Sequence, residues 1–95
     1  MHIITRKRLN EFIEKHPDAK SALQHWYRQA KSKDFKSFAE LRESFGSADQ
    51  VGNLTVFNIG GNKFRLIAAI HYNRRTVYIR AVLTHKEYDE GKWKE

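Results

Sequence analysis

The feature that most constrains the fold is a run of alternating apolar and charged residues from Val56 to Asp89. Alternate side chains of a strand point to opposite faces of a sheet, so this period of two predicts strands with two unlike faces. The even positions are apolar from 63 to 72, and the odd positions are apolar from 77 to 83. We therefore expect an antiparallel meander over residues 54–59, 62–72 and 76–84, with one apolar face and one arginine-bearing face.

The residues before this run have the spacing of amphipathic helices. We expect a short strand over residues 2–5, helices over about 6–16, 19–32 and 38–45, and a loop over 47–53. Thr5 and Asp18 are predicted to cap the first two helices, and Ser37 with Glu40 matches a capping box for the third. Helices followed by a run of strands predict an α+β fold, in which an N-terminal short strand and two to three helices pack on one face of a small antiparallel sheet.

Length and composition indicate one domain that spans residues 1–95. The chain has no cysteine, which excludes disulfides, cysteine-based zinc sites and thiol chemistry. No apolar run approaches the roughly 20 residues of a membrane span, and no signal-peptide pattern follows the first methionine. We therefore expect a cytoplasmic protein with no membrane association.

The charge balance is strongly basic, with 18 lysines and arginines against 11 acidic residues and a net charge of +7. Nucleic acid, an acidic protein or an anionic membrane are the usual partners of such a domain. A solvated basic surface is the alternative. Because several of the cations fall inside predicted strands, we adopt RNA as the working hypothesis for the partner.

The arginine-bearing face and its edge supply the candidate site residues. They are Asn58, Lys63, Arg65, Tyr78, Arg80, His85 and Tyr88. RNA can be cut without a metal when its own 2′-OH attacks the neighbouring phosphate. That reaction needs a group that transfers protons, which suits the imidazole of His85, and cations that hold the phosphate, which suit Arg65 and Arg80. Tyr88 follows His85 by three residues, so one helical turn would bring both to one side, where the phenol donates a proton or stacks on a base.

Each candidate also has an ordinary structural explanation. The two arginines could be exposed strand residues or members of ion pairs, His85 a surface residue, and Tyr88 part of the core. The five histidines lack the spacing of metal ligands, and no phosphate-binding loop or dinucleotide fingerprint is present. We therefore expect no metal site and no cofactor.

The sequence resembles the HigB-type toxins of bacterial type II toxin–antitoxin systems, within the RelE/ParE-like superfamily. The resemblance extends over nearly the whole chain. It rests on the segments HIITRKRLNEF, EKHPDAKSALQHWYR, FKSFAELRESFGSADQV, VFNIGGNKFRL and YIRAVLTHKEYD. The last two segments together are the most specific.

The resemblance implies a small ribonuclease that cuts mRNA on the translating ribosome and is silenced by a helix-turn-helix antitoxin of the HigA kind, in a toxin–antitoxin hetero-oligomer. It also implies a curved sheet with helices on one side. By position it assigns function to Arg65, Arg80, His85 and Tyr88, with weaker assignments for Lys63 and Asn58. The superfamily often brings a glutamate or lysine from the sheet, but the strands predicted here contain no glutamate, so His85 is the leading proton-transfer residue.

Two other functions fit the same sequence. One is a non-catalytic RNA-binding or ribosome-binding module, in which the basic face makes only phosphate contacts. The other is a toxin directed at gyrase, as some members of the superfamily are. A basic face with histidine and tyrosine argues against the gyrase route, and we adopt RNA cleavage as the leading hypothesis.

Overall fold

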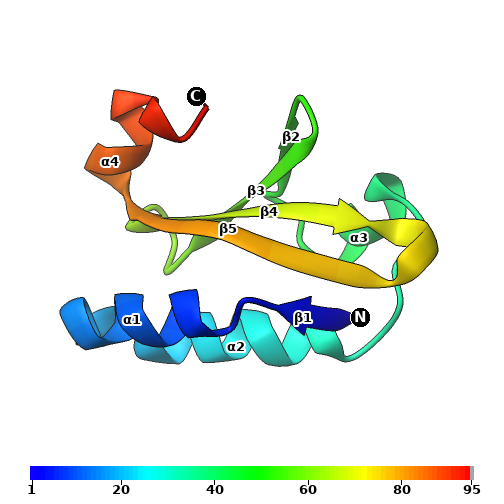
Figure 1. Ribbon diagram of the computed structural model, residues 1–95, viewed down its shortest axis with the longest axis horizontal. Coiled ribbons are helices and arrows are strands. Elements are labelled where there is room, and N and C mark those ends of the chain that lie inside the picture. Colours follow the sequence, from blue (N-terminus) through cyan, green and yellow to red (C-terminus); the bar gives the residue numbers. More distant parts are fainter. Residues whose placement is uncertain (95) are drawn as a thin grey trace.

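The computed structural model describes residues 1–94 and confirms the α+β fold. Its helices are α1 (Lys7–Lys15), α2 (Lys20–Lys31), α3 (Phe38–Ser44) and α4 (His85–Glu90), with 3₁₀ turns at Pro17–Ala19, Tyr72–Arg74 and Lys92–Lys94. Its strands are β1 (His2–Ile4), β2 (Asp49–Val51), β3 (Leu54–Ile59), β4 (Phe64–His71) and β5 (Thr76–Thr84). In Figure 1 the helices α1 and α2 lie below the sheet, while α4 and the β2–β3 hairpin rise above it.

The five strands form one sheet in the order β1-β5-β4-β3-β2. The predicted meander of β3, β4 and β5 is antiparallel, whereas β1 pairs parallel to β5 at one edge. Strand β2 pairs antiparallel with β3 and occupies residues that the sequence predicted to be a loop. It is only three residues long and mostly exposed, so it carries no apolar alternation that would reveal it.

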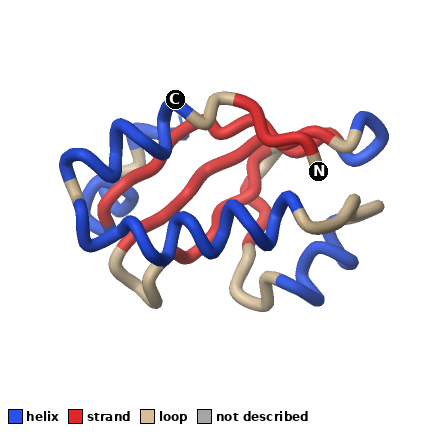
Figure 2. The backbone as a smooth tube through the Cα atoms, turned by 90° about the horizontal axis from the view of Figure 1, so that it is seen from below, coloured by secondary structure: helices blue, strands red, loops and turns tan. Residues whose placement is uncertain are grey.

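The main core lies between the sheet and the helices that cross it (Figure 2). Leu23 and Trp26 of α2 and Leu41 of α3 are almost fully buried against Phe57 and Leu66 of the sheet. Phe57 makes edge-to-face contacts with Trp26 and Phe45, with ring centroids 5.4 and 5.0 Å apart. Such aromatic pairs stabilise a core by about 0.5–1.5 kcal/mol beyond the burial of area. Helices α1, α2 and α3 therefore pack on one face, as predicted, whereas α4 lies on the other.

Two predicted helix caps are wrong. Thr5 has a positive φ of 73° and lies in the tight turn between β1 and α1, so Arg6 precedes the helix without a side-chain cap. Asp18 lies inside the 3₁₀ turn Pro17–Ala19, which leads directly into α2. The predicted cap of α3 is confirmed, because the Ser37 hydroxyl accepts a hydrogen bond from the Glu40 N–H at 3.2 Å.

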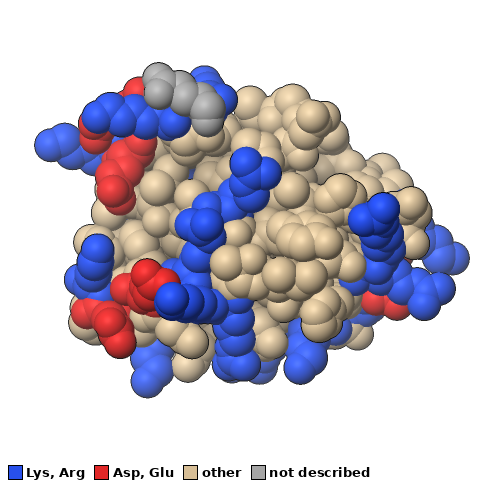
Figure 3. Space-filling view, in the orientation of Figure 1, with Lys and Arg blue, Asp and Glu red and all other residues tan. Residues whose placement is uncertain are grey.

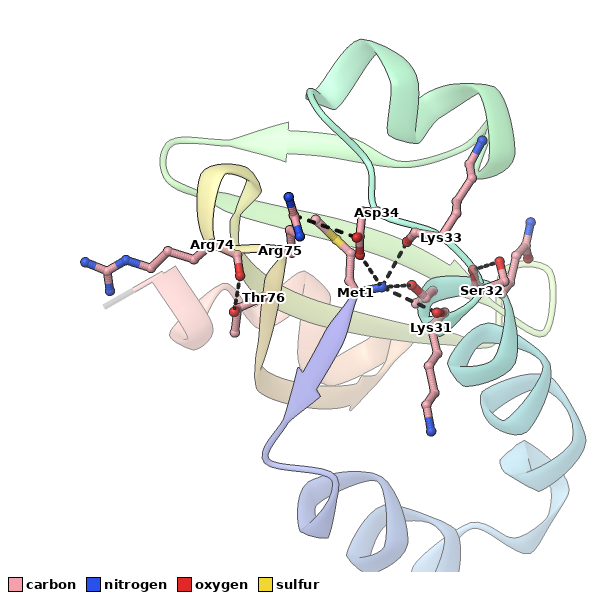
Figure 4. Close-up of polar contacts among 10 residues, drawn as sticks. Met1, Lys31, Ser32, Lys33, Asp34, Arg74, Arg75 and Thr76 are labelled. Carbon is pink, nitrogen blue, oxygen red and sulfur yellow. Dashed lines mark hydrogen bonds and ion pairs between the residues drawn. The ribbon is translucent and has the colours of Figure 1, made fainter.

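The terminal ammonium of Met1 caps the C-terminal end of α2 (Figure 4). It donates to the carbonyl oxygens of Ala30, Lys31 and Lys33 and lies 3.2 Å from the Asp34 carboxylate. Carbonyls at the end of a helix lack partners within the helix and carry partial negative charge, so a cation is favoured there. The contact fixes the first strand against α2.

The face of the sheet opposite α1 and α2, here called the open face, differs from the prediction. A β-bulge interrupts the β4–β5 register at Arg80, so that Ile67 pairs with Ala81 and Ala68 pairs with Ile79. The bulge shifts Ala81 and Leu83 onto the open face, where they join Ile67 and Arg65, although the alternation predicted both for the apolar core. Bulges bend a strand and redirect its side chains, and they occur often beside functional sites.

The open face carries buried apolar side chains as well as cations. Val56 and Ile67, a register pair of β3 and β4, are 3% and 1% exposed yet lie outside the main core cluster. Figure 3 shows the molecule from the side and not onto the open face. In that view lysines and arginines lie along the lower edge, at both ends and in the middle, while part of the upper surface carries none. The predicted arginine-bearing face is therefore a partly apolar surface with a few placed cations.

Candidate functional site

Helix α4 places His85 and Tyr88 at the end of β5, where the sequence predicted a helical turn or loop. A complete capping box begins this helix, since the Thr84 hydroxyl accepts from the Glu87 N–H and the Glu87 carboxylate accepts from the Thr84 N–H. The His85 N–H donates to the Lys63 carbonyl at 3.0 Å, which joins the helix to the β3–β4 turn. The backbone that carries His85 and Tyr88 is therefore fixed by the capping box and by the hydrogen bond to the β3–β4 turn.

The imidazole of His85 has a partner that the sequence reasoning missed. Its Nδ1 lies 2.9 Å from the Asp89 carboxylate, one helical turn on. Both side chains remain about half exposed, at 47% and 60%. A carboxylate on Nδ1 fixes the orientation of the ring and leaves Nε2 available to a substrate. The i, i+4 spacing of histidine and aspartate in a predicted helical turn is the signal that would have found this pair.

Arg65 is buried beneath α4 and is only 7% exposed. Its Nη1 donates to the carbonyl oxygens of Asn62 and Phe64, and its Nη2 donates to the Asn62 side-chain oxygen at 3.1 Å. The guanidinium carbon lies 5.3 Å from the ring centroid of Tyr88. Arg65 thus joins the β3–β4 turn to the Tyr88 ring, an arrangement that suits a residue that positions others.

Arg80 has the opposite environment. It is exposed at the bulge of β5, and within residues 1–94 no carboxylate lies within ion-pair distance of it. Leu83, the register partner of Arg65, is three residues away, or about 10 Å along the strand. The two predicted arginines therefore occupy separate places on the open face, and Arg80 is the one whose guanidinium is available.

The other predicted site residues are Asn58, Lys63 and Tyr78. Asn58 is the register partner of Arg65, and the exposed Lys63 lies in the turn that accepts the His85 N–H. Tyr78 lies farther along β5, opposite Ala69, and packs edge to face against His71 at 5.2 Å. The fold therefore brings Asn58, Lys63, Arg65, His85 and Tyr88 to one end of the open face. It leaves Arg80 about 10 Å along β5 from that end and Tyr78 farther away still.

Trp93 is, after Asp89, the second residue of the site that the sequence reasoning missed. Gly91 adopts the left-handed conformation at the end of α4, with φ of 76°, and the chain then turns back through Lys92–Lys94. The indole Nε1 donates to the Tyr88 carbonyl at 3.0 Å, and the two rings stack with centroids 5.1 Å apart and planes 12° apart. Trp93 therefore covers Tyr88 from the C-terminal side.

Residues 1–94 show no sign of two other kinds of site. They contain no group of three or more histidine, cysteine, aspartate or glutamate side chains that could hold a metal ion. No helix in this part of the chain is long and apolar enough to cross a membrane.

Comparison with known proteins agrees with the fold and the motifs. Residues 19–91 match the family model described as HigB_toxin, RelE-like toxic component of a toxin-antitoxin system. The match covers most of the chain, so the protein belongs to the HigB toxin family.

The curated relatives have the same extent as this chain. The mRNA interferase toxin HigB of Escherichia coli (strain K12) is 39% identical over 92 residues, which are 94% of this chain and 88% of that protein. The mRNA interferase HigB of Shigella flexneri matches equally well. The mRNA interferase HigB of Escherichia coli O6:H1 is 32% identical over 93 residues. The family resemblance inferred from the sequence motifs is confirmed.

Proposed function

We propose that this toxin is a ribosome-dependent endoribonuclease that cleaves mRNA and thereby inhibits translation. The observation that carries the proposal is the pairing of His85 with Asp89 on the same helix as Tyr88. The open face also carries Arg80, which has no acidic partner in the described chain. The relatives are named mRNA interferases, which supports the same substrate.

The proposed reaction uses the RNA's own 2′-OH and needs no metal. The 2′-oxygen attacks the adjacent phosphorus, the bond from phosphorus to the 5′-oxygen breaks, and the proton lost by the 2′-OH is balanced by one delivered to the 5′-oxygen. His85 transfers a proton through Nε2, while Asp89 holds Nδ1 at 2.9 Å and stabilises the ring when it is charged. A positioned group of this kind contributes about 10²–10⁴ in rate.

The remaining site residues divide by their exposure. Arg80 holds the scissile phosphate, because its guanidinium is free to donate two hydrogen bonds to phosphate oxygens. The Arg65 guanidinium already donates hydrogen bonds to Asn62 and Phe64. Only its remaining N–H groups can bind the phosphate, so its main role is to position Tyr88. Tyr88 serves as the acid or orients a base, and Lys63, Asn58 and Tyr78 contact the flanking RNA.

The ribosome and the antitoxin belong to the same proposal. The ribosome presents a single mRNA strand in the cytoplasm, so the toxin needs little affinity for free RNA. A helix-turn-helix antitoxin of the HigA kind neutralises the toxin in a hetero-oligomer. The net charge of +7 favours an acidic segment of that partner.

The experiment that tests this function adds the purified protein to a reconstituted translation reaction and maps mRNA ends by primer extension, beside a ribosome-free reaction. We expect cuts only with ribosomes, and we expect His85→Ala to slow cleavage by about 10²–10⁴. Intact mRNA in both reactions would contradict the proposal. In that case inhibition of gyrase supercoiling would indicate a gyrase toxin, and RNA binding without a product would indicate a non-catalytic module.

A further inference from the structure

The open face contains a cavity of about 410 Å³ beside Arg80. Its lining residues come mainly from the β2–β3 turn and from the turn that follows α4. Both segments rise on the same side of the sheet in Figure 1. The lining residues are Val51, Gly52, Asn53, Leu54, Arg80, Trp93 and Lys94. His85, Arg65 and Tyr88 do not line it, so the cavity adjoins the proposed reaction centre and shares only Arg80 with it.

Trp93 is the aromatic surface of this cavity, and it is held in place. Its indole N–H is bonded to the Tyr88 carbonyl, and its ring rests against the Tyr88 ring. Tyr88 in turn lies over the buried Arg65. The Tyr88 ring is thus already in contact with a cation and an indole, whereas the indole extends to the cavity.

The side chains that line the cavity determine which kind of ligand it can bind. Trp93, Val51 and Leu54 offer apolar surface to a flat ring, Asn53 offers an amide that can donate and accept, and Arg80 and Lys94 supply positive charge. None of the lining residues within 1–94 is acidic. A planar heterocycle with polar edges, joined to a phosphate, satisfies all of these groups.

We propose that this cavity is a nucleobase subsite, in which an unpaired base of the RNA strand packs on Trp93 while Arg80 holds the phosphate next to it. The inference rests on the proposed ribonuclease function and names how that site takes its substrate. Stacking of one base on an aromatic side chain is worth a factor of about five to 150 in binding, from the roughly 1–3 kcal/mol found by alanine substitution. The subsite therefore fixes where the strand lies relative to His85.

The experiment is the equivalent of a double-mutant cycle: it combines Trp93→Ala in the protein with the removal of single bases from the RNA. Synthetic mRNAs that carry one abasic nucleotide at successive positions around the cut are cleaved on ribosomes by wild-type protein, Trp93→Ala and Trp93→Phe. For wild type, removal of one particular base should slow cleavage tenfold to a hundredfold. Trp93→Ala should be slowed by a similar factor and should then be indifferent to that base, since residues in contact show non-additive effects. Trp93→Phe, which keeps an aromatic ring, should recover most of the rate.

Two results would overturn the subsite while the ribonuclease function stands. One is cleavage by Trp93→Ala at the wild-type rate. The other is losses from Trp93→Ala and from the abasic nucleotide that simply multiply at every position.

A binding measurement decides the subsite if the wild-type protein cuts no RNA at all. Trp26 is 3% exposed in the core, so a change in tryptophan fluorescence on titration with 2′-O-methylated single-stranded RNA reports on Trp93. Quenching that disappears with the abasic strand and in Trp93→Phe supports the subsite. Equal quenching by both strands, or none, overturns it.

Discussion

At the scale of single residues, Asp89 is the side chain whose role follows most directly from geometry. It lies 2.9 Å from Nδ1 of His85 and has no other ion-pair partner within residues 1–94. Asp89→Asn should slow mRNA cleavage by at least about tenfold, but by less than the roughly 10²–10⁴ expected for loss of the imidazole itself. Single-turnover cleavage across a range of pH measures this effect. Glu90→Gln is the matched control, and equal rates for the two variants would remove Asp89 from the mechanism.

Tyr72 gives a second prediction at this scale. Burial raises the pKa of Tyr72 above its ordinary value of 10.0, and the nearby Thr55 side chain opposes the shift to a lesser extent. The Tyr72 hydroxyl makes no hydrogen bond of full geometry to the described residues, so we treat the Thr55 contact as weak. The folded state holds the proton more tightly than the unfolded state does. The corresponding stability is complete below pH 10 and is lost as the pH rises through the folded pKa.

Tyr72→Phe should therefore change stability little at pH 7, because it removes a hydroxyl without a full hydrogen bond. Above pH 10 the variant should lose less stability than the wild type does. Urea unfolding at neutral and alkaline pH measures both values. A variant that follows the wild-type decline above pH 10 would show that another group controls it.

At the scale of elements, the capping box of α4 is the device that holds the proposed reaction centre. Thr84→Ala removes the side chain that accepts the Glu87 N–H, which should cost about 1 kcal/mol and loosen His85 and Tyr88. Ser37→Ala removes the equivalent contact from α3, away from α4, at a similar cost. Thermal unfolding should show similar losses for both variants. Only Thr84→Ala should reduce cleavage, and a similar reduction by Ser37→Ala would mean that activity simply follows stability.

The same elements show what the sequence can predict. The meander, the first two helices and the Ser37 cap of α3 follow from periodicity and cap chemistry, which are local. The bulge at Arg80 does not, because Ala81, Val82 and Leu83 are three apolar residues in succession and fit either phase of the alternation. Strand β2 has no apolar signal of its own, and Thr5 has a left-handed backbone that its residue type disfavours.

Only part of the candidate site could be predicted from the sequence, as was the case for the fold. The residue types and the chain positions of Arg80, His85 and Tyr88 indicated a cluster at the end of the last strand. The burial of Arg65 was not predictable, because it depends on α4 folding back over the β3–β4 turn. Trp93 reaches the open face through the reversal at Gly91, which involves tertiary contacts that no spacing reveals.

At the scale of the whole molecule, the contact between Met1 and Asp34 joins the first strand to the end of α2. The Met1 ammonium is buried while the Asp34 carboxylate is 52% exposed. Asp34→Asn should therefore lower the free energy of unfolding by no more than about 1 kcal/mol, with a smaller effect at high salt. Urea unfolding at low and high ionic strength measures this, with the exposed Asp18→Asn as the control. An equal effect of both substitutions would mean that only net charge matters.

Arg80 is proposed to hold the scissile phosphate of ribosome-bound mRNA, and comparison with a second exposed arginine separates this role from the effect of charge alone. Arg80 and Arg74 are both exposed, and each alanine variant lowers the net charge by one, but Arg74 lies in the β4–β5 turn. Single-turnover cleavage of ribosome-bound mRNA should fall by about 10²–10³ for Arg80→Ala, as for the loss of one transition-state donor. For Arg74→Ala it should stay within about twofold of wild type, since a single screened surface charge contributes little. Equal rates for the two variants, whether both fast or both slow, would contradict the account.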